Sequence, residues 1–260
     1  MIPGLMGFLW LIIWRRMYHR PEEHPRISDA EREMILAETR ELVSARKARL
    51  SELLKLPQTW GTIIAKSFTD PVWFFVTDWF PIYLVAKGIP LKSGLIAVWI
   101  PFIAADFGNF FGGGVSGFLV KRGWSLGSAR KSLVIFGGIG VLLLIPTLFT
   151  VNLYFITILF ALSTFAYASF STIANVLPSD LFFSQSVATV SGMSGTGAGI
   201  GTILAFKLIG YFSDLPHIAA SHSFDRIIVA AGIVPFIGMV LVLFLVRNTE
   251  ATRHGLVRPI

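Results

Sequence analysis

Cysteine is absent from the sequence, and charged residues are scarce. The absence of cysteine excludes disulfide bonds and thiolate metal sites. Charged residues make up 14% of the 260 residues, whereas a soluble domain carries about 25%. Because 54% of the residues are hydrophobic, the composition argues against a soluble protein and favours a membrane protein.

Residue patterns that support catalysis or metal binding are also lacking. The five histidines fall in loops or tails, and none has ligand-like spacing with carboxylates. We therefore predict that the chain is not an enzyme and has no catalytic residue, metal or cofactor. An intramembrane aspartyl protease would need two facing aspartates. Asp78 and Asp106 supply two aspartates, but the residues around them do not resemble that family. A membrane enzyme is thus the weakest alternative.

Long apolar runs dominate the rest of the sequence. About 20 apolar residues cross the ~30 Å hydrocarbon core as a helix. The runs that are long enough are residues 59–86, 94–120, 131–149, 153–177, 187–213 and 224–246. A further run at residues 2–14 is too short to span comfortably, and its flanks do not match those of a signal peptide. We interpret it as the end of a membrane helix that begins before this chain.

Positive charge is distributed unevenly along the chain, which has a formal net charge of +7. If the loops alternate between the two sides of a membrane, most lysines and arginines fall on one side, in residues 15–57, 121–131 and the tail. The other side has only Lys87, Lys92 and Arg226 outside the spans. By the positive-inside rule, we expect a multi-pass inner-membrane protein whose linker and C-terminus are cytoplasmic. The basic charge then reflects topology, and we predict no nucleic-acid partner.

The predicted fold class is an all-α membrane protein, a six-helix bundle preceded by a partial helix and a linker helix. The expected parts are the end of a membrane helix, a cytosolic linker with an amphipathic helix, the bundle and a cytosolic tail, at residues 1–18, 19–57, 58–248 and 249–260. In the linker, Ser28 and Glu31 match the S-x-x-E capping box. In the first span, we expect a break at Asp70-Pro71, because a residue before proline avoids helical geometry. Lys66 and Asp70 would then lie near the cytoplasmic surface.

Glycine is concentrated in the second and fifth spans, at the spacing of the G-x-x-x-G motif. The pairs are Gly108/Gly112, Gly113/Gly117, Gly195/Gly199 and Gly197/Gly201. This spacing lets helix backbones approach closely in lipid. The strict nucleotide-binding glycine patterns are not matched, so we predict close helix packing.

Three charged residues lie deep within the spans. Asp106 is near the middle of its span, where a carboxylate costs ~2.5–3.5 kcal/mol, and Asn109 shares its face. Such a carboxyl group suits proton coupling, although a hydrogen bond to a neighbouring helix would also account for it. Asp78 and Lys207 lie at similar depths and could form an ion pair, or Lys207 could extend to the surface.

A line of polar side chains follows one face of the fourth span. Tyr167, Ser171 and Asn175 recur every four residues, and Thr172 flanks them. Ser194 and Thr196 offer similar groups in the fifth span. Hydroxyl and amide groups suit a polyhydroxylated ligand, so we predict that this set lines a cavity. The alternative is that the hydroxyls bond their own helix backbone.

Four blocks of the sequence resemble the anion:cation symporter family of the major facilitator superfamily, and bacterial hexuronate, galactonate and glucarate carriers in particular. They are RPEEHPRISDAEREMI, DPVWFFVTDWFPIYLVAKG, WIPFIAADFGNFFGGGVSGFLVKRGWSLGSARK and NVLPSDLFFSQSVATVSGMSGTGAGIGTI. The resemblance implies twelve helices in two halves around a central site, with uptake driven by protons. This chain would supply the end of helix six, the linker and helices seven to twelve.

The resemblance also assigns roles to residues of this chain. The residues expected to bind substrate or line the cavity are Asp78, Trp79, Tyr167, Ser171, Thr172, Asn175, Ser194 and Thr196. Those expected to act in proton coupling or as intramembrane charges are Asp78, Asp106, Asn109 and Lys207. The segment SGFLVKRGWSLGSARK resembles a cytoplasmic loop signature whose basic positions are Lys121, Arg122, Arg130 and Lys131. The aspartate typical of that signature is missing, which weakens the expectation of a gating salt bridge at this loop.

We therefore predict a transporter for proton-coupled uptake of a sugar acid or related organic anion, present as its C-terminal half. Its expected partners are the lipid bilayer, a small organic anion, a proton and the missing N-terminal six-helix half. The alternative is a truncated fragment without transport activity, or a half-carrier that requires a partner half.

Overall fold

The computed structural model describes residues 2–20, 22–43, 48–213, 222, 224–247 and 257. Their regular structure is helical apart from an isolated bridge between Phe182 and Val257. The chain divides into two compact units, residues 1–46 and 47–260.

The first unit contains two helices, α1 (Ile2–Met17) and α2 (Asp29–Val43). Large apolar side chains of α1, such as Phe8 and Trp10, are exposed. The start of α2 follows the predicted cap, because the backbone N–H of Glu31 donates to Oγ of Ser28 at 3.2 Å. The assignment of residues 1–18 to the end of a membrane helix stays a prediction.

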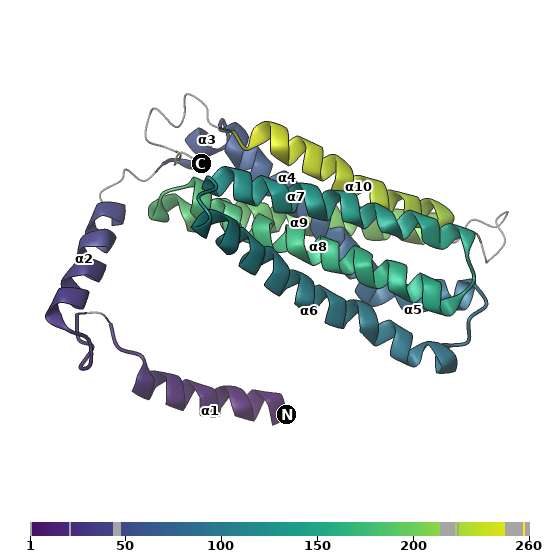
Figure 1. Ribbon diagram of the computed structural model, residues 1–260, viewed down its shortest axis with the longest axis horizontal. Helices are drawn as coiled ribbons and strands as arrows, with labels where there is room; N and C mark the ends of the chain where they lie inside the picture. The colour runs from purple at the N-terminus through teal and green to yellow at the C-terminus, as the bar shows by residue number, and fades with distance from the viewer. Residues whose placement is uncertain are drawn as a thin grey trace. The chain divides into compact units, whose positions relative to one another are not determined.

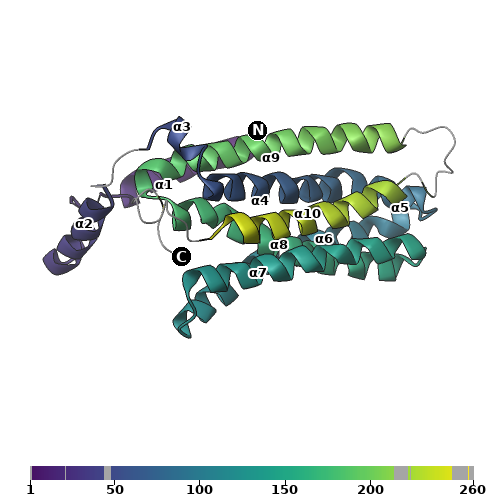
Figure 2. The same ribbon diagram turned by 90° about the horizontal axis from the view of Figure 1, so that it is seen from above.

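The second unit is a bundle of long helices that run side by side (Figure 1; Figure 2). Its elements are α3 (Leu50–Leu53), α4 (Pro57–Phe74), η1 (Phe75–Trp79), α5 (Phe80–Ala86), α6 (Leu91–Lys121), α7 (Leu126–Gly140), η2 (Val141–Phe149), α8 (Leu153–Leu181), α9 (Ser184–Ser213) and α10 (Asp225–Leu245). Among the described residues, five helical segments are long and apolar enough to cross a membrane: α6 from Ala97, α7 with η2, α8, α9 and α10. The predicted all-α class is confirmed.

The first predicted span consists of α4, η1 and α5, and it is not broken where we expected. Helix α4 continues through Pro71 to Phe74, so the predicted break at Asp70-Pro71 was wrong. The irregular turn is the π-helical η1, in which the N–H of Phe80 donates to the carbonyl of Phe75. Pro81 accounts for this turn, because it has no N–H to donate and its ring crowds the carbonyl four residues earlier. Lys66, Asp70 and Asp78 therefore all lie on one continuous helical segment, formed by α4 and η1.

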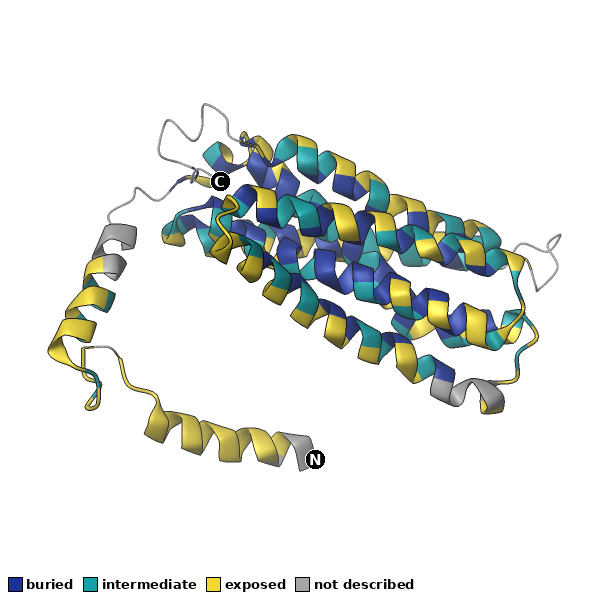
Figure 3. Cartoon of the chain, viewed as in Figure 1, coloured by how far each residue is buried: buried dark blue, intermediate teal, exposed yellow. Residues whose placement is uncertain are grey.

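Helix α8 lies at the centre of the bundle. It packs against α6, α7, η2 and α4, while α9 packs mainly on α4. Figure 3 shows buried residues along α8 and exposed residues along the outer side of α6. Large apolar side chains of α9, such as Leu204, are also exposed. The bundle therefore leaves large apolar surfaces uncovered, such as those at Phe110 and Ile203.

Half of the predicted glycine contacts occur within the chain. A Cβ atom at Gly112 would lie 2.8 Å from the carbonyl oxygen of Ser169 on α8, and one at Gly197 would lie 2.6 Å from Oγ of Ser67 on α4. Their partners in the motif, Gly108 and Gly201, are equally close to α8 and α4. The close-packing prediction is confirmed for these two pairs.

The remaining glycine pairs have more space around them. No atom of a described residue lies within 4 Å of a Cβ built at Gly117, Gly195 or Gly199, and at Gly113 the nearest is 4.0 Å away. For these pairs, the packing prediction was wrong within this chain. These glycines lie on uncovered surface of α6 and α9.

Candidate functional site

Polar side chains of α4, α6 and α8 meet on one part of the bundle, which we call the polar face. We define it by Lys66, Asp70, Asn109, Tyr167, Ser171, Thr172 and Asn175. Two side-chain hydrogen bonds join its helices. The Nζ atom of Lys66 donates to Oδ1 of Asn175 at 2.7 Å, and the hydroxyl of Thr172 donates to Oδ1 of Asn109 at 2.9 Å. The predicted line on α8 thus contacts both α4 and α6.

Lys66 lies between an amide and a carboxylate. Besides the bond to Asn175, its Nζ atom is 3.4 Å from Oδ2 of Asp70, one turn further along α4. The side chains of Lys66 and Asp70 are 22% and 20% exposed, so the pair is largely enclosed but still accessible. An ion pair reduces the cost of placing either charge in a low-dielectric region.

From the sequence we did not predict Lys66 and Asp70 as site residues. We expected a helix break at Pro71, which would have separated them from the rest of the span. Their i, i+4 spacing, which places two side chains on one helical face, was the available signal. The contact with Asn175 joins residues 109 positions apart, and nothing local to either helix indicates it.

Aromatic rings border the other end of the polar face. Tyr167 is buried, and its ring stacks on Trp73 of α4 with 6.1 Å between ring centroids. Trp73 in turn meets Phe102 of α6 edge-on at 5.4 Å. Ser171 is half-buried between Tyr167 and the exposed Asn175. The line therefore changes from an aromatic contact at Tyr167 to an amide at Asn175 that accepts a hydrogen bond from Lys66.

Asp106 is exposed at the middle of α6, one turn before Asn109. Its neighbours Phe107 and Phe110 are 64% and 80% exposed. Among the described residues, Asp106 forms no salt bridge within 4 Å. It therefore lies on an open edge of α6, between the polar face and exposed aromatic side chains.

Asp78 and Lys207 do not meet in this structure. Both side chains are exposed, and no salt bridge joins these two described residues. The neighbouring Trp79 is half-buried and lies near the rings of Phe206 and Phe224, at 6.4 and 6.2 Å. The ion pair that their similar depths allowed is not formed.

The two hydroxyl groups singled out on α9 bond to their own helix. Ser194 is buried and donates to the carbonyl of Val190 at 3.0 Å. Thr196 is exposed and donates to the carbonyl of Gly192 at 3.0 Å. This is the backbone bonding that is usual for hydroxyls in membrane helices.

A salt bridge forms at the loop signature, with an acidic partner that we had not identified. Nε of Arg130 donates to Oδ2 of Asp180 at 2.7 Å, and its Nη1 donates to Oγ of Ser116 at 2.8 Å. Asp180 is near the end of α8 and supplies the carboxylate that the loop lacks. The remaining basic positions form no such pair with a described residue: Lys121 is exposed, Lys131 is half-buried, and Arg122 lies 4.6 Å from the centre of the Phe118 ring.

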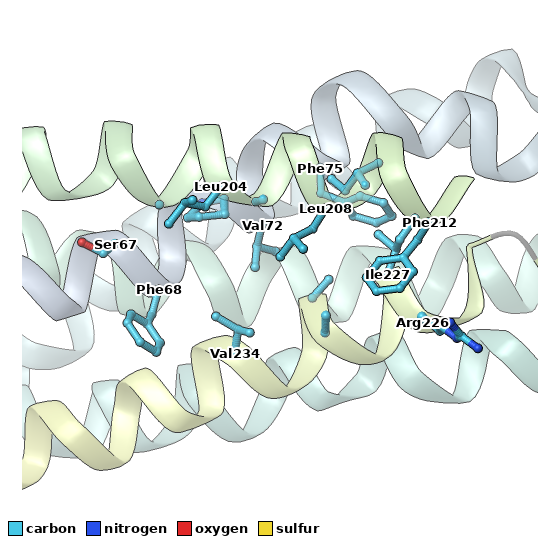
Figure 4. Close-up of a pocket in the computed structure, with 16 residues that line it drawn as sticks. Ser67, Phe68, Val72, Phe75, Leu204, Leu208, Phe212, Arg226, Ile227 and Val234 are labelled. Carbon is cyan, nitrogen blue, oxygen red and sulfur yellow. The ribbon is translucent and has the colours of Figure 1, made fainter. Parts of the chain in front are cut away.

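A separate cavity of about 250 Å³ lies between α4, α9 and α10 (Figure 4). Apolar side chains such as Val72, Leu204 and Ile227 form most of its wall, while Ser67 and Arg226 contribute polar atoms. None of the residues that define the polar face lines this cavity. The polar face, and not this cavity, is therefore the candidate site for a hydrophilic ligand.

Comparison with known proteins matches residues 1–206 to the Major Facilitator Superfamily. The chain belongs to the major facilitator superfamily. It is 29% identical to the hexuronate transporter of Escherichia coli strain K12 over 221 residues, which are 82% of this chain and 50% of the relative. It is 30% identical to the probable galactarate/D-glucarate transporter GarP of the same strain, over 96% of this chain and 58% of the relative.

A third relative gives the same result. The D-galactonate transporter of Escherichia coli O6:H1 is 30% identical over 96% of this chain and 59% of its own length. The family predicted from the sequence blocks is thus confirmed, and this member of the superfamily is a multi-pass membrane protein. It spans about half of the length of the curated relatives that it matches.

Proposed function

We propose that this chain is the C-terminal half of a carrier for sugar acids or related organic anions, and that the polar face lines the transport path. The observation that supports this most directly is the Lys66–Asn175 hydrogen bond at 2.7 Å, between two helices of the membrane bundle. Charged and amide groups within a membrane are costly, and they commonly mark substrate and ion pathways.

The relatives are about twice as long as the part of them that this chain matches, which supports a second half of the carrier as its partner. In carriers built from repeats, the substrate site lies at the interface between the two halves, which rock against each other. The exposed apolar surface around Phe110 on α6 and the open glycines of α9 suit contact with such a half. The half-carrier would sit in the inner membrane, with its linker and C-terminus in the cytoplasm.

The names of the relatives suggest the class of substrate. Hexuronate, galactonate and glucarate all combine a carboxylate with several hydroxyl groups. The Tyr167–Asn175 line offers hydroxyl and amide groups for the hydroxylated part. Uptake would be coupled to protons, with Asp78 or Asp106 as the carboxylate that carries the proton.

Uptake by proteoliposomes tests the proposal. The carrier that contains this chain, with its N-terminal half, should take up labelled D-glucuronate or D-galactonate, and a protonophore should abolish accumulation. We expect Asn175→Ala to reduce uptake about tenfold or more, since hydrogen bonds to charged partners contribute about 1.5–3 kcal/mol. Ser179→Ala on the same helix is the matched control, because its exposed hydroxyl bonds only its own helix.

Each arm of the experiment has an outcome that contradicts the proposal. Uptake by Asn175→Ala equal to that of Ser179→Ala would remove Asn175 from the site. If no sugar acid is accumulated by the carrier, the proposed function is wrong. Uptake by this chain alone would contradict the need for a partner half.

A further inference from the structure

We propose that Lys66 binds the carboxylate of the transported anion, and that Asp70 is the partner this carboxylate replaces. The inference rests on the proposed function and adds to it the residue that selects for a negative charge. It follows from the geometry around the Nζ atom of Lys66.

The contacts of Lys66 leave room for another acceptor. An ammonium group has three N–H donors. One is directed to Oδ1 of Asn175 at 2.7 Å. The nearest oxygen of Asp70 is 3.4 Å away, which is longer than the about 2.7–2.9 Å of a strong charge-assisted hydrogen bond. The Asp70 contact is thus an ion pair longer than a strong hydrogen bond, and we expect a carboxylate with a shorter contact to replace it at Lys66.

Two other cations of the bundle are less suitable. Arg130 already has a carboxylate oxygen at 2.7 Å and the hydroxyl of Ser116 at 2.8 Å. Lys207 is exposed on α9, a helix that contributes no residue to the polar face. Lys66 alone among these three is close to an amide and to the hydroxyl groups that would bind a sugar chain.

The arrangement of α8 indicates how the rest of the anion would lie. Ser171 is one helical turn from Asn175, a rise of about 6 Å, and Tyr167 is one turn further. An anion whose carboxylate lies on Lys66 would extend its hydroxyl groups along this line. The Trp73–Tyr167 stack would form the far boundary.

Competition for one cation predicts opposite effects for the two members of the pair. Without Asp70, Lys66 has no internal carboxylate, so the anion should bind more tightly. Without Lys66, the anion meets Asp70 and is repelled, so it should bind more weakly. If the pair were purely structural, both substitutions would be damaging.

Binding measurements on the purified carrier that contains this chain test the inference. The variants are Lys66→Gln, Lys66→Arg, Asp70→Asn and the double variant Lys66→Gln/Asp70→Asn, with Lys92→Gln as a control at an exposed lysine. The probe is D-galactonate, compared with the uncharged galactitol. Calorimetry gives Kd, and size-exclusion chromatography shows whether each variant is folded.

We expect Lys66→Gln to raise the Kd for D-galactonate about tenfold or more, and Asp70→Asn to lower it. Lys66→Arg should retain most of the affinity. The double variant has no unpaired charge and should fold. Without repulsion by Asp70 it should bind less weakly than Lys66→Gln, yet more weakly than the unmodified carrier. Galactitol binding and the Lys92→Gln control should not change.

Several results would overturn the inference. They are an unchanged Kd in folded Lys66→Gln or in the double variant, an equal loss in Lys66→Gln and Asp70→Asn, and an equal loss for galactitol. In these cases the unmodified carrier still binds D-galactonate, so the proposed function would stand. If the unmodified carrier binds no sugar acid, both proposals are wrong.

Discussion

The contact between α6 and α8 at Gly112 can be tested by adding a single methyl group. In Gly112→Ala, the new Cβ atom would lie 2.8 Å from the carbonyl oxygen and 2.9 Å from the Cα atom of Ser169. Ordinary carbon contacts are about 3.5–4.0 Å, and backbone atoms cannot rotate away. Helix α6 must therefore move away from α8 by roughly 1 Å. The Thr172–Asn109 hydrogen bond joins the same two helices close to this contact.

The expected magnitude combines two opposing effects. Forcing extra volume into a packed contact costs about 1–3 kcal/mol, whereas alanine favours a helix over glycine by about 1 kcal/mol. Gly114→Ala is the matched control, because it gains the same helix propensity and no atom lies within 4 Å of its Cβ. The difference between the two variants therefore isolates the steric effect, which we expect to be about 1–3 kcal/mol.

Reversible unfolding of the purified chain in detergent micelles measures this difference. We expect Gly112→Ala to have the lower free energy of unfolding and Gly114→Ala to equal or exceed the unmodified chain. Equal free energies of unfolding for the two variants would show that α6 and α8 do not approach as closely at Gly112 as described.

Two further predictions concern polar contacts within the bundle. Neutralising Arg130 or Asp180 alone should lower the free energy of unfolding by about 1–3 kcal/mol, since each leaves a charged partner in an enclosed place. The double variant Arg130→Gln/Asp180→Asn should lose less than the sum, and additive losses in a double-mutant cycle would contradict the pairing. Tyr83→Phe should cost about 1 kcal/mol, because the buried hydroxyl donates to the carbonyl of Thr147 at 3.1 Å; an unchanged unfolding curve would exclude that bond.

Part of the candidate site could be predicted from the sequence. The line of Tyr167, Ser171 and Asn175 follows from a four-residue period, and in the structure it lies on one side of α8. The four-residue period does not predict which residues of other helices contact this line. That Asn175 meets Lys66, and that Thr172 meets Asn109, depends on how α4 and α6 are rotated and crossed against α8.

The error at Pro71 shows why a local rule can fail inside a bundle. Proline removes an N–H that would bond the carbonyl of Ser67 four residues earlier. In the structure, Gly201 of α9 lies against this carbonyl, and α4 continues without a break. The chain deviates at η1 instead, before Pro81. The proline rule, which considers only neighbouring residues, does not include a helix that is far away in the sequence and packs against α4.

The sequence by itself determined the helical spans, the all-α class and the family. These depend on the length of apolar runs and on the order of residues within short blocks, which are local properties of the chain. Only the tertiary structure decided which polar side chains of different helices meet, as for Lys66 with Asn175 and Arg130 with Asp180. An ion pair requires two side chains to approach within a few ångströms, and for residues on different helices that distance is set by the rotation and crossing of the packed helices.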